Sequence, residues 1–289
     1  MSRLALGTVQ FGLPYGIANQ TGQVSRLEAK AILQSALING VDTLDTAIAY
    51  GDSEVCLGEL GVQDFKIVTK LPELPDDCLN VHAWVQQQFN LSLSRLGVKK
   101  VHGLLLHRPQ QLLGANGVAI YRALLALKDT GQVKKIGVSI YSPNELELLM
   151  PKFDFDLIQA PFNLIDQRLK STGLMQRLKD QDIEIHTRSA FLQGLLLMPK
   201  TMIPTKFSKW DSLLDTWHQW LECHNFTAVQ ACLAFPLSFP EIDRVVIGAD
   251  SLSQFEQVIS AVSNLPNINM PNLNSDDEML INPANWNRL

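Results

Sequence analysis

Short, almost wholly apolar runs alternate along the chain with longer segments in which apolar residues recur every three or four positions. The short runs predict eight strands buried on both faces, because such strands are apolar throughout. They are LALGTV (4–9), TLD (43–45), FKIVTK (65–70), VHGLLLH (101–107), KIGVSI (135–140), LIQAPF (157–162), IEIHTR (183–188) and RVVIG (244–248). The longer segments predict helices over 25–39, 53–60, 78–95, 118–130, 143–150, 171–180, 208–222 and 227–236.

This alternation predicts an α/β protein with one closed, parallel, eight-stranded (β/α)8 barrel, a TIM barrel. About 250 residues is typical of that fold, and the chain has 289. An open doubly wound sheet would place a GxGxxG turn after its first strand, whereas here QFGLPYGIANQTG follows and no helix begins among its glycines. We therefore predict a single domain over 1–289, with the Asn- and Pro-rich stretch 265–289 as an irregular C-terminal surface tail.

Composition and charge exclude several classes of binding partner. The chain is 46% hydrophobic and 18% charged, as is ordinary for a globular protein, and its net charge of -5 offers no basic face for a nucleic acid or an anionic membrane. No apolar run approaches the roughly 18 residues of a membrane span, and the start lacks the features of a secretory signal, so we expect a cytoplasmic protein. The four cysteines show no metal-ligand spacing, and no metal is expected.

Polar side chains stand at the ends of several predicted strands. In a (β/α)8 barrel these carboxyl ends form the active site. Each residue alone has a structural explanation, such as a turn residue for Asp45 or a solvated strand end for Lys70. Four titratable residues of complementary chemistry at the ends of three consecutive strands favour a catalytic site instead. They are Asp45, Tyr50, Lys70 and His107.

These four side chains suit the delivery of a proton to a carbonyl group. The phenol of a tyrosine has an ordinary pKa near 10, and a nearby ammonium lowers it. We expect Lys70 to supply this charge and Asp45 to hold Lys70 charged and oriented. A neutral His107 would donate a hydrogen bond to the carbonyl oxygen of the substrate. Ser53, just after Tyr50, is predicted to cap the following helix.

Taken in order, the motifs of the chain resemble those of the aldo-keto reductase superfamily. The matching pieces are GTVQFG, DTAIAYGDSE, VTK, LLLH, GVS, LIQAPFN, RSAFLQGLL and VVIGADSLSQFEQ, over about residues 4–260. The resemblance implies an oxidoreductase whose barrel binds NADP(H) or NAD(H) without a Rossmann fold, with Asp45, Tyr50, Lys70 and His107 as catalytic tetrad. Hydride would pass from the nicotinamide to a carbonyl carbon while Tyr50 protonates the oxygen, and Tyr50 would act as base in the reverse reaction.

The resemblance also implies the cofactor contacts. The carboxamide would lie near Ser139 and Gln159, the pyrophosphate near Ser189, Phe191 and Gly194, and the adenosine end near Gly248, Ala249, Gln254 and Gln257. Two positions depart from the family pattern. Ile140 replaces an Asn that often follows Ser139, and Arg188 stands where many members stack a Tyr on the nicotinamide. Arg188 would either stack its guanidinium there or reach a phosphate or an anionic substrate.

The preference between the two cofactors is open at this point. NADP(H) is favoured over NAD(H) by family habit alone, since Gly248 and Gln254 stand where NADP-specific members often place Lys and Arg. Asp250 and Glu256 add negative charge nearby.

The substrate and the overall role are the least readable features. The opening LGTVQFGLPYGIANQTGQ looks most like bacterial members that we associate with cell-surface polysaccharide or sugar-modifying gene sets, which points to a sugar-like carbonyl. Two other functions stay open: a lyase that uses Lys70 as a Schiff-base nucleophile, and a cofactor-binding or sensing barrel with weak turnover. The expected partner is a small-molecule carbonyl or alcohol, with no nucleic acid and no membrane, and the expected state is a monomer or small homo-oligomer.

Overall fold

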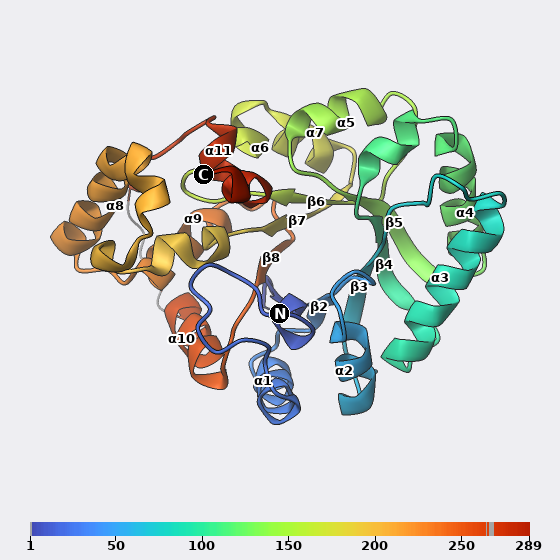
Figure 1. The fold of residues 1–289 in the computed structure, drawn as a ribbon, viewed down its shortest axis with the longest axis horizontal. Coiled ribbons are helices and arrows are strands. Elements are labelled where there is room, and N and C mark those ends of the chain that lie inside the picture. The colour runs from blue at the N-terminus through green and yellow to red at the C-terminus, as the bar shows by residue number, and fades with distance from the viewer. Residues whose placement is uncertain (1, 264, 266–268) are drawn as a thin grey trace.

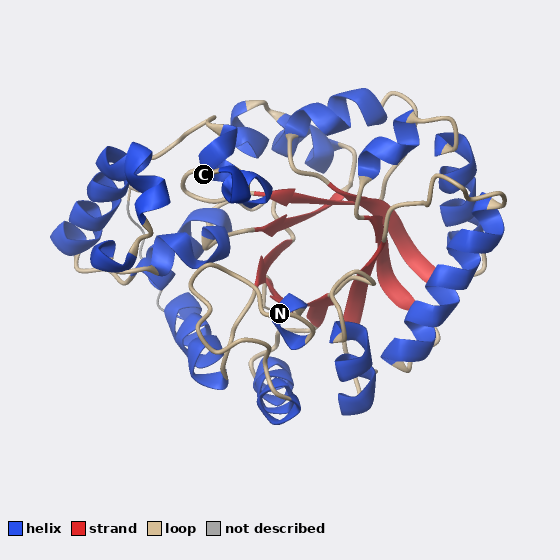
Figure 2. Ribbon diagram, viewed as in Figure 1, coloured by secondary structure: helices blue, strands red, loops and turns tan. Residues whose placement is uncertain are grey.

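In the computed structural model, which describes residues 2–263, 265 and 269–289, eight parallel strands close into a barrel in their sequence order. Figure 2 shows the strands as a central ring with the helices outside it. The strands are β1 (Leu4–Gly7), β2 (Thr43–Asp45), β3 (Lys66–Leu71), β4 (Val101–Leu106), β5 (Val133–Ser139), β6 (Leu157–Pro161), β7 (Glu184–Arg188) and β8 (Arg244–Ile247). The predicted fold class is confirmed, and all eight strands fall at their predicted places.

The predicted helices also exist, with small shifts at their ends. They are α1 (Arg26–Ile38), α2 (Ser53–Leu60), α3 (Val81–Leu96), α4 (Gly117–Asp129), α5 (Pro143–Leu149), α7 (Leu174–Asp180), α8 (Asp211–His224) and α9 (Ala228–Leu237). In Figure 1, α8 lies farthest from the barrel, at the left of the view. No helix in the described part of the chain is long and apolar enough to cross a membrane.

Several helical segments were not predicted. They are α6 (Arg168–Ser171), α10 (Leu252–Ser263), α11 (Glu278–Ile281) and the 3-10 helices η1 (Val9–Phe11), η2 (Pro109–Leu113), η3 (Leu192–Leu197), η4 (Lys200–Met202), η5 (Thr205–Trp210) and η6 (Pro283–Arg288). Most of these are short. α10 is not, and its buried face of Phe255, Val258 and Ala261 shows the i, i+3 spacing that identifies a helix in sequence.

The barrel interior holds a small apolar cluster beneath a polar layer. Val68, Leu105 and Leu157 form this cluster, separate from the larger core between the strands and the helices. A Cβ on Gly137 would lie only 1.7 Å from the carbonyl oxygen of Leu157, so a glycine lets β5 and β6 fit here. The apolar cluster closes the barrel, and the chemistry is confined to the carboxyl ends of the strands.

A buried carboxylate fixes α2, the helix that follows Tyr50. Glu54 Oε1 accepts hydrogen bonds from Thr69 Oγ1 at 2.7 Å and from Ser92 Oγ at 2.6 Å. Arg95 Nε donates to Glu54 Oε2 at 2.8 Å. Since Thr69 lies on β3 and the other two on α3, this one side chain ties α2 to the barrel and to its neighbouring helix.

The C-terminal segment differs from the irregular surface tail that was predicted. It contains α11 and η6, and it buries Leu280, Ile281 and Trp286. The indole of Trp286 donates to the carbonyl oxygen of Leu280 at 2.9 Å. The segment is rich in Asn and Pro, so its composition gave no sign that these few apolar residues pack into the core. Residues 266–268 of the predicted tail lie outside the described residues, and the single-domain organisation over 1–289 stays a prediction.

Candidate active site

A cavity of about 690 Å³ opens at the carboxyl ends of the strands. It falls within the range of about 300–1,000 Å³ that is usual for small-molecule sites. The predicted site residues that line it are Asp45, Tyr50, His107, Ser139, Arg188, Ser189, Phe191, Gly194, Gly248, Gln254 and Gln257. The other three predicted residues, Lys70, Gln159 and Ala249, are buried and are not among the residues that line it.

A buried ion pair forms the polar layer beneath the cavity. Lys70 Nζ donates to both carboxylate oxygens of Asp45, at 2.8 and 2.7 Å, and to the carbonyl oxygen of Thr46 at 3.0 Å. Burial lowers the pKa of Lys70, and the charge of Asp45 opposes this. Gln159 Nε2 donates to Asp45 Oδ1 at 2.6 Å, and Ser139 Oγ donates to Gln159 Oε1 at 3.2 Å. Gln159 therefore holds Asp45 in place and links it through these hydrogen bonds to Ser139, which lines the cavity.

Close packing against the segment after β1 sets the turn that carries Tyr50. A Cβ on Gly12 would lie 1.9 Å from the carbonyl oxygen of Tyr50 and 2.4 Å from the amide nitrogen of Ser53. The hydroxyl of Ser53 donates to the carbonyl oxygen of Thr8 at 2.8 Å. Ser53 is therefore not the cap that the sequence predicted. Asp52 occupies the N-cap position of α2, and its side chain makes no capping bond.

Tyr50 lies in a setting that keeps its phenol protonated. Lys70 Nζ lies 5.0 Å from the centroid of the Tyr50 ring, and the His107 ring meets it edge-on with centroids 5.7 Å apart. Burial, followed by the charge of Asp45, raises the pKa of Tyr50 well above its usual range, and the charge of Arg188 lowers it. From the sequence we expected Lys70 to lower this pKa. In the structure burial and the charge of Asp45 outweigh the nearby ammonium, so Tyr50 is an acid that holds its proton at neutral pH.

His107 is neutral at physiological pH. Burial, followed by the charge of Lys70, lowers its pKa from 6.5 to about 4. A neutral imidazole can donate one hydrogen bond to a substrate oxygen without competing with Tyr50 as an acid. This charge state agrees with the one expected from the sequence.

The depressed pKa of His107 predicts how folding stability responds to acid. The unfolded chain binds this proton near pH 6.5 and the folded chain only near pH 4, so the free energy of unfolding falls as the pH drops through that window. We expect His107→Asn to lose part of this pH dependence. Urea unfolding at pH 7.5 and pH 5 would measure it, with the exposed His82→Asn on α3 as control. The charged groups that act on the pKa of His107 are Lys70, Asp45, Arg188 and Arg108. Equal pH dependence in wild type and His107→Asn would contradict the lowered pKa of His107.

Sequence reasoning missed part of the cavity wall. Gln10, Tyr15, Asn19 and Tyr141 line it without having been predicted. Tyr141 could have been found from its position two residues after Ser139. Asn19 could not, because its side chain lies on the wall through a hydrogen bond of 3.0 Å from its Nδ2 to Asp250 Oδ1, 231 residues away.

The two departures from the family pattern contact each other. The side chain of Ile140 is buried in the core and points away from the cavity chemistry, while its carbonyl oxygen accepts a hydrogen bond of 3.0 Å from Arg188. The guanidinium carbon of Arg188 lies 4.5 Å from the centroid of the Tyr141 ring. Arg188 and Tyr141 thus form one wall of the cavity together.

Comparison with known proteins decides the family. A family model described as Aldo/keto reductase family matches residues 3–275. The chain belongs to the aldo/keto reductase family. This confirms the resemblance of the sequence motifs to that family. The structural likeness agrees with it: AKR11C1 from Bacillus halodurans superposes with a TM-score of 0.74 at 19% identity, over 92% of this chain and 88% of that one. At such identity the likeness concerns the fold alone.

Curated relatives of this aldo/keto reductase are distant. The aldo-keto reductase YhdN of Bacillus subtilis is 26% identical over 206 residues, which are 68% of this chain and 60% of YhdN. L-glyceraldehyde 3-phosphate reductase of Escherichia coli K12 is 24% identical over 88% of this chain and 84% of its own length. The 6-dehydroglucose reductase of Agrobacterium fabrum is 27% identical over 71% and 68%. The match spans less than two thirds of YhdN and, at 59%, of the oxidoreductase YtbE of Bacillus subtilis.

Proposed function

We propose that this aldo/keto reductase reduces an aldehyde or ketone to an alcohol, or catalyses the reverse, with NAD(P)H as the hydride donor and Tyr50 as the general acid or base. One observation carries the proposal. A protonated Tyr50 lines the cavity next to a neutral His107 and directly above the buried pair of Asp45 and Lys70. This arrangement suits the protonation of a carbonyl oxygen.

Each side chain then has a separate task. Tyr50 gives its proton to the carbonyl oxygen, and His107 donates a hydrogen bond to the same oxygen as negative charge develops on it. Lys70, held by Asp45, stabilises the phenolate that remains on Tyr50, because its ammonium lies 5.0 Å from the ring. In the direction of alcohol oxidation, the Tyr50 phenolate accepts the proton. A nicotinamide dinucleotide held in this cavity would serve as the hydride donor or acceptor.

The cavity lining fits a dinucleotide. Its neutral polar groups, including Ser139, Gln254 and Gln257, suit the hydroxyls and the amide of such a ligand. Leu192, Gln193 and Gly194 have positive φ in succession, and the N–H groups of Leu192 and Gly194 donate to the carbonyl oxygens of Ser189 and Phe191, both at 2.9 Å. These bonds hold the loop that we propose, from the resemblance, to lie beside the pyrophosphate.

The preference for NADP(H) over NAD(H) stays a prediction. Asp250 lies on the wall where the resemblance places the adenosine end, and its pKa is raised by burial although a hydrogen bond from Asn19 lowers it. Among the described lining residues, Arg188 is the single Lys or Arg, and it belongs to the catalytic end. A 2'-phosphate at the adenosine end would therefore find the carboxyl group of Asp250 and no Lys or Arg among the described residues that line that end. Both cofactors must be tested.

Binding of the reduced cofactors tests the proposed function. We expect the fluorescence of NADPH, NADH or both to change on titration with the protein at micromolar concentrations. An excess of the oxidised form should reverse the change, since both forms occupy one cavity. Measuring NADPH and NADH side by side also decides their order. If neither binds, the proposed function and the alternative of a cofactor-sensing barrel are both wrong.

The geometry argues against the lyase alternative. Lys70 has no free N–H group in the structure, is fully buried, and is not among the residues that line the cavity. A Schiff-base nucleophile must be neutral and accessible to its carbonyl substrate.

For the substrate of the proposed reductase, we propose a sugar-like carbonyl compound. The names of two relatives, L-glyceraldehyde 3-phosphate reductase and 6-dehydroglucose reductase, support this class.

A further inference from the structure

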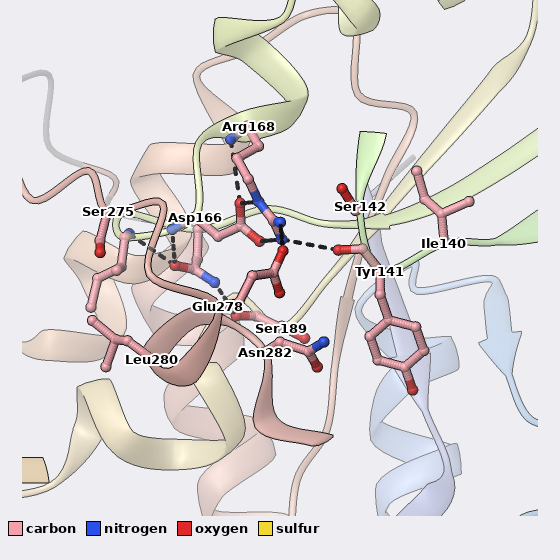
Figure 3. A network of polar contacts seen from close by, with 12 residues as sticks. Ile140, Tyr141, Ser142, Asp166, Arg168, Ser189, Ser275, Glu278, Leu280 and Asn282 are labelled. Carbon is pink, nitrogen blue, oxygen red and sulfur yellow. Dashed lines mark hydrogen bonds and ion pairs between the residues drawn. The ribbon is translucent and has the colours of Figure 1, made fainter. Parts of the chain in front are cut away.

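Two arginines donate to neighbouring backbone carbonyls beside the cavity, and only one of them has acidic partners. Arg168 donates to the carbonyl oxygen of Tyr141 at 2.9 Å. Its Nε and Nη2 also bind the two oxygens of Asp166, at 2.9 and 2.8 Å, and its Nη1 binds Glu278 on α11. Figure 3 shows Arg168 among these three partners. The charge of Arg168 is therefore fully neutralised.

Arg188, by contrast, has only neutral partners. Its Nη2 donates to the carbonyl oxygen of Ile140 at 3.0 Å, its Nη1 donates to Ser189 Oγ at 3.3 Å, and its guanidinium lies over the Tyr141 ring. No carboxylate pairs with it in the described part of the chain. A guanidinium has five N–H donors, so three remain for a ligand. Because Arg188 is half-buried and lines the cavity, these donors and the charge are available there.

The positive charge of Arg188 is not balanced by its surroundings at the catalytic end of the cavity. The other cation there, Lys70, is paired with Asp45. Arg188 acts on the groups around the reacting centre: its charge lowers the pKa of Tyr50 and of His107, in each case as a smaller effect than burial. An anion bound to Arg188 would lie close to the carbonyl that Tyr50 protonates.

The network in Figure 3 holds the partners of Arg188 in place. Arg168 fixes the backbone at Tyr141, whose ring packs against Arg188. Asn163 Nδ2 donates to the carbonyl oxygen of Ser189 at 3.0 Å and thereby fixes the backbone of Ser189, the residue whose hydroxyl accepts from Arg188. The guanidinium is thus oriented before any ligand arrives, which lowers the entropy lost on binding.

We propose that the carbonyl substrate carries an anionic group, a carboxylate or a phosphate, and that Arg188 binds it. This rests on the proposed function and adds the class of substrate to it. Planar, bidentate recognition of such oxygens is the task to which a guanidinium is best suited. The pairing would orient the substrate with its carbonyl carbon toward the hydride and its oxygen toward Tyr50.

Matched aldehydes test the proposal. 4-Carboxybenzaldehyde and 4-nitrobenzaldehyde have similar size and substituents that withdraw electrons, but only the first is an anion. We expect wild type to show a higher kcat/KM for the carboxylate, and Arg188→Gln to lower the carboxylate-to-nitro ratio by about tenfold to a hundredfold. Arg188→Lys should keep part of the preference. The matched control is Arg177→Gln, since Arg177 pairs with Glu147 on the exposed surface.

A binding measurement separates this proposal from the proposed function. Benzoate and benzamide differ in charge and are not reduced, so calorimetry can compare them without turnover. Equal benzoate affinity in wild type and Arg188→Gln would overturn the proposal. So would a variant that loses affinity for the reduced cofactor and keeps the preference for benzoate, since Arg188 would then serve the cofactor. If wild type binds neither NADPH nor NADH but prefers benzoate through Arg188, the anion site stands and the proposed function fails.

Discussion

We expect the proposed carbonyl reduction to fall by about 10²- to 10⁴-fold in kcat when Tyr50 is replaced by Phe. The variant keeps the aromatic ring, including its edge-on contact with His107 at 5.7 Å between centroids, and removes the one atom that delivers the proton. His107 cannot take over as acid, because its pKa of about 4 leaves it neutral at the pH of the assay.

Steady-state kinetics with a nicotinamide absorbance assay would measure this loss. Cofactor fluorescence titrations should show that Tyr50→Phe still binds the reduced dinucleotide within a few-fold of wild type. Tyr121→Phe is the matched control, because the Tyr121 hydroxyl donates to the carbonyl oxygen of Asp154 on the outer surface, away from the cavity. Turnover by Tyr50→Phe equal to that of the control would exclude Tyr50 as the acid.

The residues at the strand ends were predictable because the barrel imposes their meeting. Once eight apolar runs indicate parallel strands, the carboxyl ends must share one rim, and Asp45, Lys70 and His107 follow from their places after three consecutive strands. No knowledge of side-chain contacts is needed for that step. The strand register then brings Asp45 close to Lys70, because Asp45 pairs with Val68, which lies two residues before Lys70 on the neighbouring strand.

What the sequence could not provide was the distribution of hydrogen bonds within the site. The expected lowering of the Tyr50 pKa by the charge of Lys70 did not account for burial or for the Asp45 carboxylate, which binds Lys70 through two hydrogen bonds, and both of these raise this pKa. In the same way, the sequence left Arg188 open between three ligands, because its lack of an acidic partner depends on where Asp166 and Glu278 lie. Both carboxylates accept hydrogen bonds from Arg168 instead, and these contacts join the segment after β6 to the C-terminal α11.

The second large effect concerns the buried pair. Lys70→Met leaves the Asp45 carboxylate buried without its counter-ion, and we expect a loss of about 3–5 kcal/mol in the free energy of unfolding together with the loss of turnover. The neighbouring pair of Asp42 and Lys66 joins the same two strands at their other ends, at 2.7 Å but partly exposed. Lys66→Met should therefore cost about 1 kcal/mol or less and leave turnover intact.

The double variant Asp45→Asn with Lys70→Met separates stability from chemistry. Removing both charges relieves the uncompensated carboxylate, so urea unfolding should show that most of the lost stability returns. Turnover should not return, because no ammonium remains near Tyr50 to stabilise its phenolate. A double variant that regains both would mean that Lys70 supports only the fold. One that regains stability alone would assign Lys70 to the proton transfer, since the cavity would then be intact and only the charge beneath Tyr50 missing.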